Sequence, residues 1–298
     1  MSDAIAAQWQ ALEALPKRTL KELFANKARL DQWSSKLDLP GGSVRFDWSK
    51  THLDADNAGA FLKLAEAVGF VQKRGAMFAG EVINVTEGRA VEHTALRGVG
   101  RETSTEEAFA LHLRMKSLVE AIHQGVLGEV KHLIHIGIGG SALGPALAID
   151  ALTRDGAMVD VHVVSNIDGC ALEAACRACD PATTLIAVAS KTFTTTETMT
   201  NARSALDWLE TNGVADPYGR VVALTAYPDK AVEWGVDETR VLPFSESVGG
   251  RYSLWSSIGF PIALALGWED FGRMLEGAAA MDTHFLEADG AANLPLRA

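Results

Sequence analysis

The sequence is poor in cysteine, and its three cysteines, Cys170, Cys176 and Cys179, lie in one short segment. An odd number of cysteines in a chain of 298 residues argues against a small secreted fold held by disulfides. Cys176 and Cys179 form a single CxxC pair, a spacing found in metal and redox sites. No second CxxC or nearby His pair accompanies them, and the segment LEAACRAC has helical composition. We therefore expect these cysteines to pack a helix.

The chain also lacks an excess of positive charge and long apolar runs. Its net charge is −11 and its pI is about 5.2, which makes it a poor candidate for sequence-independent nucleic-acid binding, since such binding needs a basic surface. An anionic ligand would have to be attracted by local groups. No apolar run approaches the roughly 20 residues of a membrane span, and residues 1–18 lack the basic start and apolar core of a secretion signal. We expect a cytoplasmic protein without nucleic-acid or membrane partners.

The apolar periodicity changes along the chain. It is helical over residues 2–40, alternates as a strand over 43–48, and is helical again over 58–71 and 105–125. Beyond residue 130, short apolar runs typical of buried strands alternate with helical segments. Strands are expected at residues 133–136, 159–164, 185–189, 221–225 and 241–243. This alternation predicts an α/β fold with a doubly wound parallel sheet flanked by helices, preceded by an N-terminal helical segment.

The segment KHLIHIGIGGSALGP, residues 131–145, reads as a buried strand, a glycine turn and the start of a helix. Free backbone N–H groups and the positive end of a helix dipole would meet at this turn, which suits a phosphate. The same letters fit the GxGxxA pattern of dinucleotide-binding folds, but the second strand ends at Ser165-Asn166 and Asp168 is displaced into the loop. A turn that only packs helix on strand is the third interpretation.

Two further stretches follow predicted strands. SKTFTTTET, residues 190–198, carries six hydroxyl groups and Lys191, all suitable donors for phosphate oxygens. Thr194 and Glu197 have the spacing of a capping box, so a helix is expected to begin here; a cap alone needs fewer hydroxyls. The stretch has no GxxxxGK[ST] pattern and is not a nucleotide P-loop. In ESVGGRYS, residues 246–253, two glycines before Arg251 favour a guanidinium that stabilises an oxyanion, with a surface salt bridge as the alternative.

IGIGGSALGP, SKTFTTTET and VGGRYSLWSSIG, in this order, closely resemble the glucose-6-phosphate isomerase family, as does the stretch GEVINVTEGRAVEHTALR over residues 80–97. The resemblance implies a sugar-phosphate-binding fold of SIS type. It also implies interconversion of glucose 6-phosphate and fructose 6-phosphate through an enediol(ate), without cofactor or metal, by a homodimer. Carried over by motif, the phosphate-binding residues are Gly140, Ser141, Ser190, Lys191, Thr192 and Thr195. Arg251 would stabilise the enediolate. Thr196 and Ala142 stand where relatives have glutamine and aspartate, with little expected effect.

A larger departure concerns the proton-transfer residues of the family. Its catalytic glutamate lies in a motif like MESNGK and its ring-opening histidine in one like GQHAF, and neither motif occurs here. His93, His284 and Glu287 are not in matching contexts and receive no role. We therefore expect an N-terminal part of a longer reading frame, or a truncated product, that is inactive alone. Without the second lobe it should expose an apolar helix over residues 260–266 and aggregate.

The resemblance also divides the chain. Residues 1–100 form the N-terminal helical segment with its signature loop, residues 101–268 the SIS domain, and residues 269–298 the start of a second lobe. Two other functions remain open. A non-catalytic SIS-type sugar-phosphate sensor would explain the missing base, and an NAD-dependent oxidoreductase would use the GxGxxA pattern but lacks the acidic residue in place.

Overall fold

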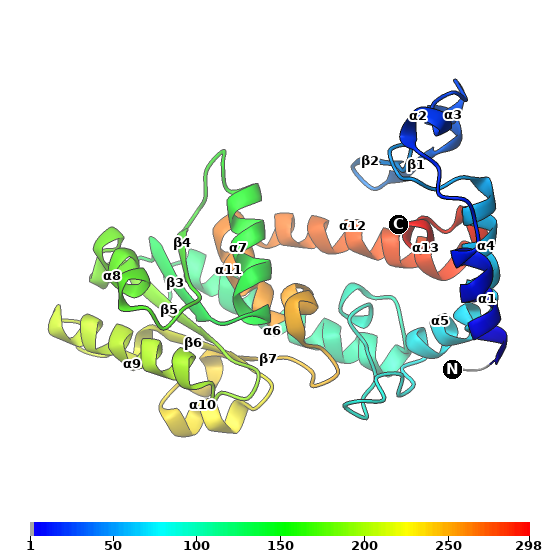
Figure 1. The fold of residues 1–298 in the computed structure, drawn as a ribbon. Coiled ribbons are helices and arrows are strands. Elements are labelled where there is room, and N and C mark those ends of the chain that lie inside the picture. Colours follow the sequence, from blue (N-terminus) through cyan, green and yellow to red (C-terminus); the bar gives the residue numbers. More distant parts are fainter. Residues whose placement is uncertain (1–2) are drawn as a thin grey trace. The chain divides into compact units, whose positions relative to one another are not determined.

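The computed structural model describes residues 3–298, and the chain divides into two compact units (Figure 1). The first comprises the chain up to residue 90 together with residues 276–298, and the second comprises residues 91–275. Helix α12, Trp268–Glu287, runs from the second unit into the first. The functional divisions at residues 100 and 268 stay predictions. Across the described residues, no helix is long and apolar enough to cross a membrane.

The first unit is mostly helical and contains one hairpin. Its helices are α1 (Asp3–Glu13), α2 (Leu20–Leu23), α3 (Arg29–Gln32), α4 (Ala55–Ala67), α5 (Phe70–Phe78) and α13 (Leu294–Arg297). Strands β1 (Ser34–Leu39) and β2 (Gly42–Asp47) pair antiparallel. The prediction of helix up to residue 40 is therefore wrong over β1. Gly41, with φ of +80°, allows the tight turn that returns the chain as β2, because a glycine adopts this left-handed conformation without strain.

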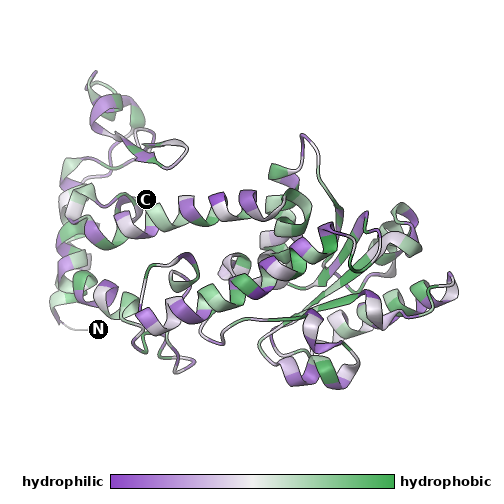
Figure 2. Ribbon diagram, turned by 180° about the vertical axis from the view of Figure 1, so that it is seen from behind, coloured by the Kyte–Doolittle hydropathy of each residue, from purple (hydrophilic) through white to green (hydrophobic). Residues whose placement is uncertain are grey.

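The second unit is built on a five-stranded sheet of order β4-β3-β5-β6-β7, and all its pairs are parallel. The strands are β3 (His132–Gly137), β4 (Asp160–Val164), β5 (Thr184–Ala189), β6 (Val221–Thr225) and β7 (Val241–Pro243). Each lies within one residue of its predicted bounds. The α/β class is confirmed, and the strands stand out as predominantly apolar in Figure 2.

Helices cover both faces of this sheet. They are α6 (Glu102–His123), α7 (Gly140–Leu152), α8 (Gly169–Ala178), α9 (Thr196–Thr211), α10 (Pro228–Trp234) and α11 (Phe260–Leu266). Short 3-10 helices connect them: η1 (Ala95–Arg97), η2 (Pro181–Thr183), η3 (Tyr218–Arg220), η4 (Glu238–Arg240), η5 (Gly250–Trp255) and η6 (Ser257–Gly259). Helices α6, α7 and α11 share one apolar cluster with the sheet, and α8, α9 and α10 share another. Each face of the sheet is thus closed by its own core.

The prediction that residues 260–266 expose apolar surface is wrong. Phe260, Ile262 and Leu264 of α11 are each 0% exposed and belong to the core that α6 and α7 complete. The cause is that α11 is hydrophobic on all sides, and such a helix is stable only when it is enclosed. The second unit covers this helix with its own elements, so the expected tendency to aggregate loses its structural basis.

Helix α6 buries a narrower face than its apolar residues indicate. Met115, Val119 and Ile122 are buried at helical spacing, as expected of an amphipathic helix. Phe109 and Leu113, two further apolar residues of this helix, are 71% and 51% exposed. Periodicity therefore identified the helix correctly, but it did not identify every side chain that faces the core.

Candidate functional site

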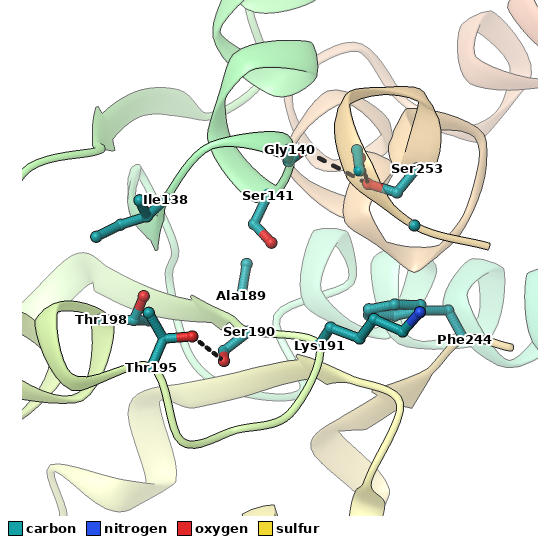
Figure 3. Close-up of a pocket in the computed structure, with 12 residues that line it drawn as sticks. Ile138, Gly140, Ser141, Ala189, Ser190, Lys191, Thr195, Thr198, Phe244 and Ser253 are labelled. Atoms are coloured by element: carbon teal, nitrogen blue, oxygen red, sulfur yellow. Dashed lines mark hydrogen bonds between the residues drawn. The ribbon is translucent and has the colours of Figure 1, made fainter. Parts of the chain in front are cut away.

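A cavity of about 220 Å³ lies at the carboxyl edge of the sheet (Figure 3). Segments that follow β3, β5 and β7 form its walls. The lining residues are Ile138, Gly140, Ser141, Ala189, Ser190, Lys191, Thr195, Thr198, Phe244, Gly249, Gly250 and Ser253. Pockets that enclose an entire drug-sized ligand typically measure about 300–1,000 Å³, so this one suits a smaller group such as a phosphoryl.

The turn after β3 brings backbone directly against the turn after β7. Gly140 is the first residue of α7, and a Cβ atom there would lie 2.2 Å from the carbonyl carbon of Gly250 and 2.8 Å from the backbone nitrogen of Arg251. Only glycine allows this approach. The Ser253 hydroxyl oxygen lies 2.8 Å from the Gly250 carbonyl oxygen and 3.4 Å from that of Gly140. The N-terminus of α7 is thereby held at the cavity with its positive dipole end facing it.

The loop after β5 presents its hydroxyl groups to the same cavity. Ser190 Oγ and Thr195 Oγ1 are 3.0 Å apart, and both face the space opposite Ser141 in Figure 3. Thr195 is the N-cap residue of α9, yet its side chain makes no capping hydrogen bond. The capping box predicted at Thr194 is wrong, because the Thr194 hydroxyl donates to the Thr192 hydroxyl at 2.8 Å. Neither the Thr194 nor the Thr195 hydroxyl therefore caps the backbone of α9.

The cavity brings together five of the seven residues predicted for the site. Gly140, Ser141, Ser190, Lys191 and Thr195 line it. Lys191 Nζ donates to the carbonyl oxygen of Glu246 at 2.8 Å, which ties the β5 loop to the segment after β7.

The remaining two predicted residues lie outside the lining. Thr192 is exposed, and its carbonyl oxygen accepts a hydrogen bond from Lys230 Nζ at 3.3 Å. The Arg251 side chain is also exposed, with its guanidinium carbon 5.9 Å from the centroid of the Tyr252 ring. The backbone of Arg251 nevertheless adjoins Gly140. The functional roles of all seven residues stay predictions.

His135 is a site-supporting residue that the sequence did not reveal. It lies in β3, is 0% exposed, and its Nε2 is 2.7 Å from the carbonyl oxygen of Ser141. Burial lowers the pKa of His135 to about 4, so the ring is neutral near pH 7 and donates its Nε2–H to that oxygen. A polar residue inside the apolar run LIHIG was the available signal. His135 is thus a positioning residue for the turn that carries Ser141.

A His135→Gln variant is expected to change the acid stability of the protein. The folded-state pKa of His135 lies below its ordinary value of 6.5, so its contribution is fully present above about pH 6.5. That contribution is lost as pH falls toward 4, up to about 3 kcal/mol. Urea unfolding at several pH values should show a shallower decline for the variant between pH 6.5 and 4. Parallel declines in the two proteins would contradict the buried neutral ring.

His93 and His284, which received no role from the sequence, both support backbone. His93 Nε2 lies 2.9 Å from the carbonyl oxygen and 3.2 Å from the backbone nitrogen of Gly249. Burial lowers the pKa of His93, which favours the neutral ring. His284, in the first unit, accepts a hydrogen bond from the Leu294 N–H at 3.1 Å. His93 therefore holds a wall of the cavity, whereas His284 holds a turn of its own unit.

The features behind the dinucleotide and metal interpretations lie elsewhere. The Asp168 carboxylate accepts a hydrogen bond from the Cys170 N–H at 3.0 Å and caps α8, so it does not stand at the end of β4. Whereas Cys170 is exposed, Cys176 and Cys179 pack into the apolar core on that face, as expected of cysteines that pack a helix. Burial raises the pKa of both thiols, that of Cys179 to about 11. Such protonated thiols are poor redox groups.

A parallel sheet with two helix N-termini and a hydroxyl-rich loop around one cavity defines an α/β domain of the SIS type. Residues 47–298 match the phosphoglucose isomerase family, and the chain belongs to that family. It is 72% identical over 290 residues to a glucose-6-phosphate isomerase of Novosphingobium aromaticivorans, covering 97% of this chain and 57% of that protein. It is 66% identical over 307 residues to one of Erythrobacter litoralis, covering 100% of this chain and 59% of that protein.

The fold has a solved counterpart. A crystal structure of a glucose-6-phosphate isomerase from Chlamydia trachomatis matches with a TM-score of 0.81 at 24% identity, covering 99% of this chain and 58% of that chain. At this identity the likeness shows the shared fold alone. The chain thus spans less than two thirds of the length of these relatives.

Proposed function

We propose that this chain supplies the phosphate-binding part of a glucose-6-phosphate isomerase. That enzyme interconverts glucose 6-phosphate and fructose 6-phosphate through an enediol(ate), in glycolysis and gluconeogenesis. The observation that carries the proposal is the convergence of Ser141, Ser190, Lys191 and Thr195 on one cavity in a chain of this family.

The phosphate would be held from two sides. The Gly140 N–H and the Ser141 hydroxyl, at the start of the 13-residue helix α7, would donate to one group of oxygens; the Ser141 N–H already donates to the Ile138 carbonyl oxygen at 3.2 Å. The hydroxyls of Ser190 and Thr195 and the ammonium of Lys191 would donate from the loop after β5. Thr192 completes the proposed set through a local rearrangement of its exposed side chain. The concentration of donors offsets the net charge of −11, which repels an anion at long range.

Arg251 is proposed to stabilise the negative charge of the enediolate. Its backbone adjoins Gly140, next to the proposed phosphate position, and its side chain is exposed. A rotation about the side-chain bonds would move the guanidinium from Tyr252 toward a bound sugar. A planar cation with several donors is well suited to a developing oxyanion. By the same family analogy, the whole protein would be a cytoplasmic homodimer that needs no cofactor.

The chain is expected to bind glucose 6-phosphate and fructose 6-phosphate but not glucose, as measured by isothermal titration calorimetry. Ser190→Ala should weaken hexose 6-phosphate binding by about 10- to 100-fold, because a hydrogen bond to a charged group contributes about 1.5–3 kcal/mol. Ser117→Ala is the matched control, since that hydroxyl donates to the Leu113 carbonyl oxygen on the exposed side of α6. Equal affinity for glucose, or an unchanged affinity in Ser190→Ala, would contradict the proposed phosphate site.

A further inference from the structure

Three potential metal ligands from separate elements of the second unit lie together. His132 is the first residue of β3, His162 belongs to β4, and Cys179 follows the last residue of α8. One ligand atom from each lies within 4.8 Å of the other two. These elements are neighbours in the fold (Figure 1). The histidine pair that the CxxC segment lacks along the sequence is therefore supplied in space by two adjacent strands.

One imidazole nitrogen of each of these histidines makes no hydrogen bond within the described part of the chain. His132 Nδ1 and His162 Nε2 are both buried, and neither has a hydrogen-bond partner among the described residues. Buried polar atoms of native proteins are nearly always paired, because an unpaired one costs about 1–3 kcal/mol. The two rings lie with their centroids 6.1 Å apart. Two unpaired nitrogens beside a buried thiol are a combination that a cation would satisfy.

We propose that His132, His162 and Cys179 bind Zn²⁺. Two imidazoles and one thiolate are a donor set that zinc accepts, with Zn–N of about 2.0–2.1 Å and Zn–S of about 2.3 Å. Tetrahedral geometry then sets ligand atoms about 3.3–3.6 Å apart, so the three side chains converge by about 1 Å on binding. Binding displaces the thiol proton to solvent.

The fourth coordination position has a candidate in the same place. Asp160 is the first residue of β4, and its Oδ2 lies 4.0 Å from His132 Nδ1. Its side chain is 71% exposed, so it can turn toward the metal, and water serves the position otherwise.

The site is distinct from the phosphate cavity and independent of the proposed function. His132 begins β3, whereas the cavity starts beyond the last residue of that strand, at Ile138. A metal here would join β3, β4 and the end of α8, and it would stabilise the folded chain because the unfolded chain does not hold the three ligands together. The site is therefore a structural metal site rather than a catalytic one.

The test is titration of the metal-free chain with Co²⁺ and Zn²⁺. Co²⁺ should produce a thiolate-to-metal charge-transfer band and the strong visible bands of four-coordinate cobalt, and Zn²⁺ should remove them. Cys179→Ser and His162→Gln should each weaken Zn²⁺ binding by at least about 100-fold. Cys170→Ser is the matched control, because that thiol is exposed and outside the group. Zn²⁺ should raise the melting temperature of the parent and of Cys170→Ser, and it should leave the melting temperatures of Cys179→Ser and His162→Gln unchanged.

Three outcomes overturn the proposal. The first is that the parent shows neither the charge-transfer band nor a zinc-dependent melting temperature. The second is that Cys176→Ser abolishes binding while His162→Gln leaves it intact, which would assign the metal to the CxxC pair. The third is that Cys179→Ser binds Co²⁺ like the parent. Melting curves without metal show whether a variant is folded, and if Cys179→Ser does not fold, the zinc affinity of His162→Gln decides between the outcomes.

Discussion

Gly140→Ala is expected to lower the affinity for glucose 6-phosphate by at least about 100-fold. The added Cβ would lie 2.2 Å from the carbonyl carbon and 2.3 Å from the carbonyl oxygen of Gly250, and backbone atoms cannot yield as a flexible side chain can. Overpacking of this kind costs about 1–3 kcal/mol, and its relief would move the turn after β3 away from the turn after β7 and change the shape of the cavity between them. Calorimetric titration with the sugar phosphate measures the loss, at about 1.4 kcal/mol for each tenfold change.

A matched control separates this effect from that of a glycine replacement in general. Gly169 is the first residue of α8, and a Cβ there would meet nothing within 4 Å. Gly169→Ala should keep the parental affinity, and both variants should be shown to be folded by circular dichroism. Parental affinity in folded Gly140→Ala would mean that the close approach of the two turns has no part in binding.

No measurable isomerase turnover is expected from the 298-residue chain, although it should bind hexose 6-phosphates. Among the described residues that line the cavity, Lys191 is the only one with an ionisable side chain. Moving a proton between C2 and C1 requires a placed base, and opening the ring requires an acid. Each such group typically contributes about 10²–10⁴-fold in rate, so the deficit should be at least about 10⁴-fold.

A coupled assay with saturating fructose 6-phosphate measures the rate, and a full-length relative such as the Novosphingobium enzyme is the positive control. Turnover within about 10⁴-fold of that enzyme would contradict the prediction and would require an acid and a base from this chain. Binding without turnover is the result that a phosphate-binding part predicts. Absence of both would count against the proposed function itself.

Local pattern was sufficient for much of the fold and for the core of the candidate site. The apolar runs gave all five parallel strands within one residue, because buried strands of a parallel sheet are continuous apolar segments. The glycine turn at Gly140 and the hydroxyls at Ser190 and Thr195 follow strand ends directly. Since parallel strands end at a common edge, their loops were bound to be neighbours. The placement of these residues around one cavity agrees with that reasoning.

Local pattern failed where a distant segment decided the outcome. Residues 34–39 have apolar spacing that fits a helix, yet pairing with β2 makes them a strand. Helix α11 was expected to need a second lobe to cover it, yet α6 and α7 of the same unit enclose it. Thr194 and Glu197 have the spacing of a capping box, but the N-cap residue of α9 is Thr195. In each case a tertiary contact outweighed a modest local preference.

The amino-acid order by itself determined the α/β class, the parallel strands and the phosphate-binding stretches, since each depends on residues close together along the chain. Only the tertiary structure decided what the histidines do. His93 reaches Gly249 from 156 positions away, and His132, His162 and Cys179 meet because β3, β4 and α8 pack together. Contacts of this kind leave no periodic trace in a sequence, because they arise when folding brings remote backbone segments into register.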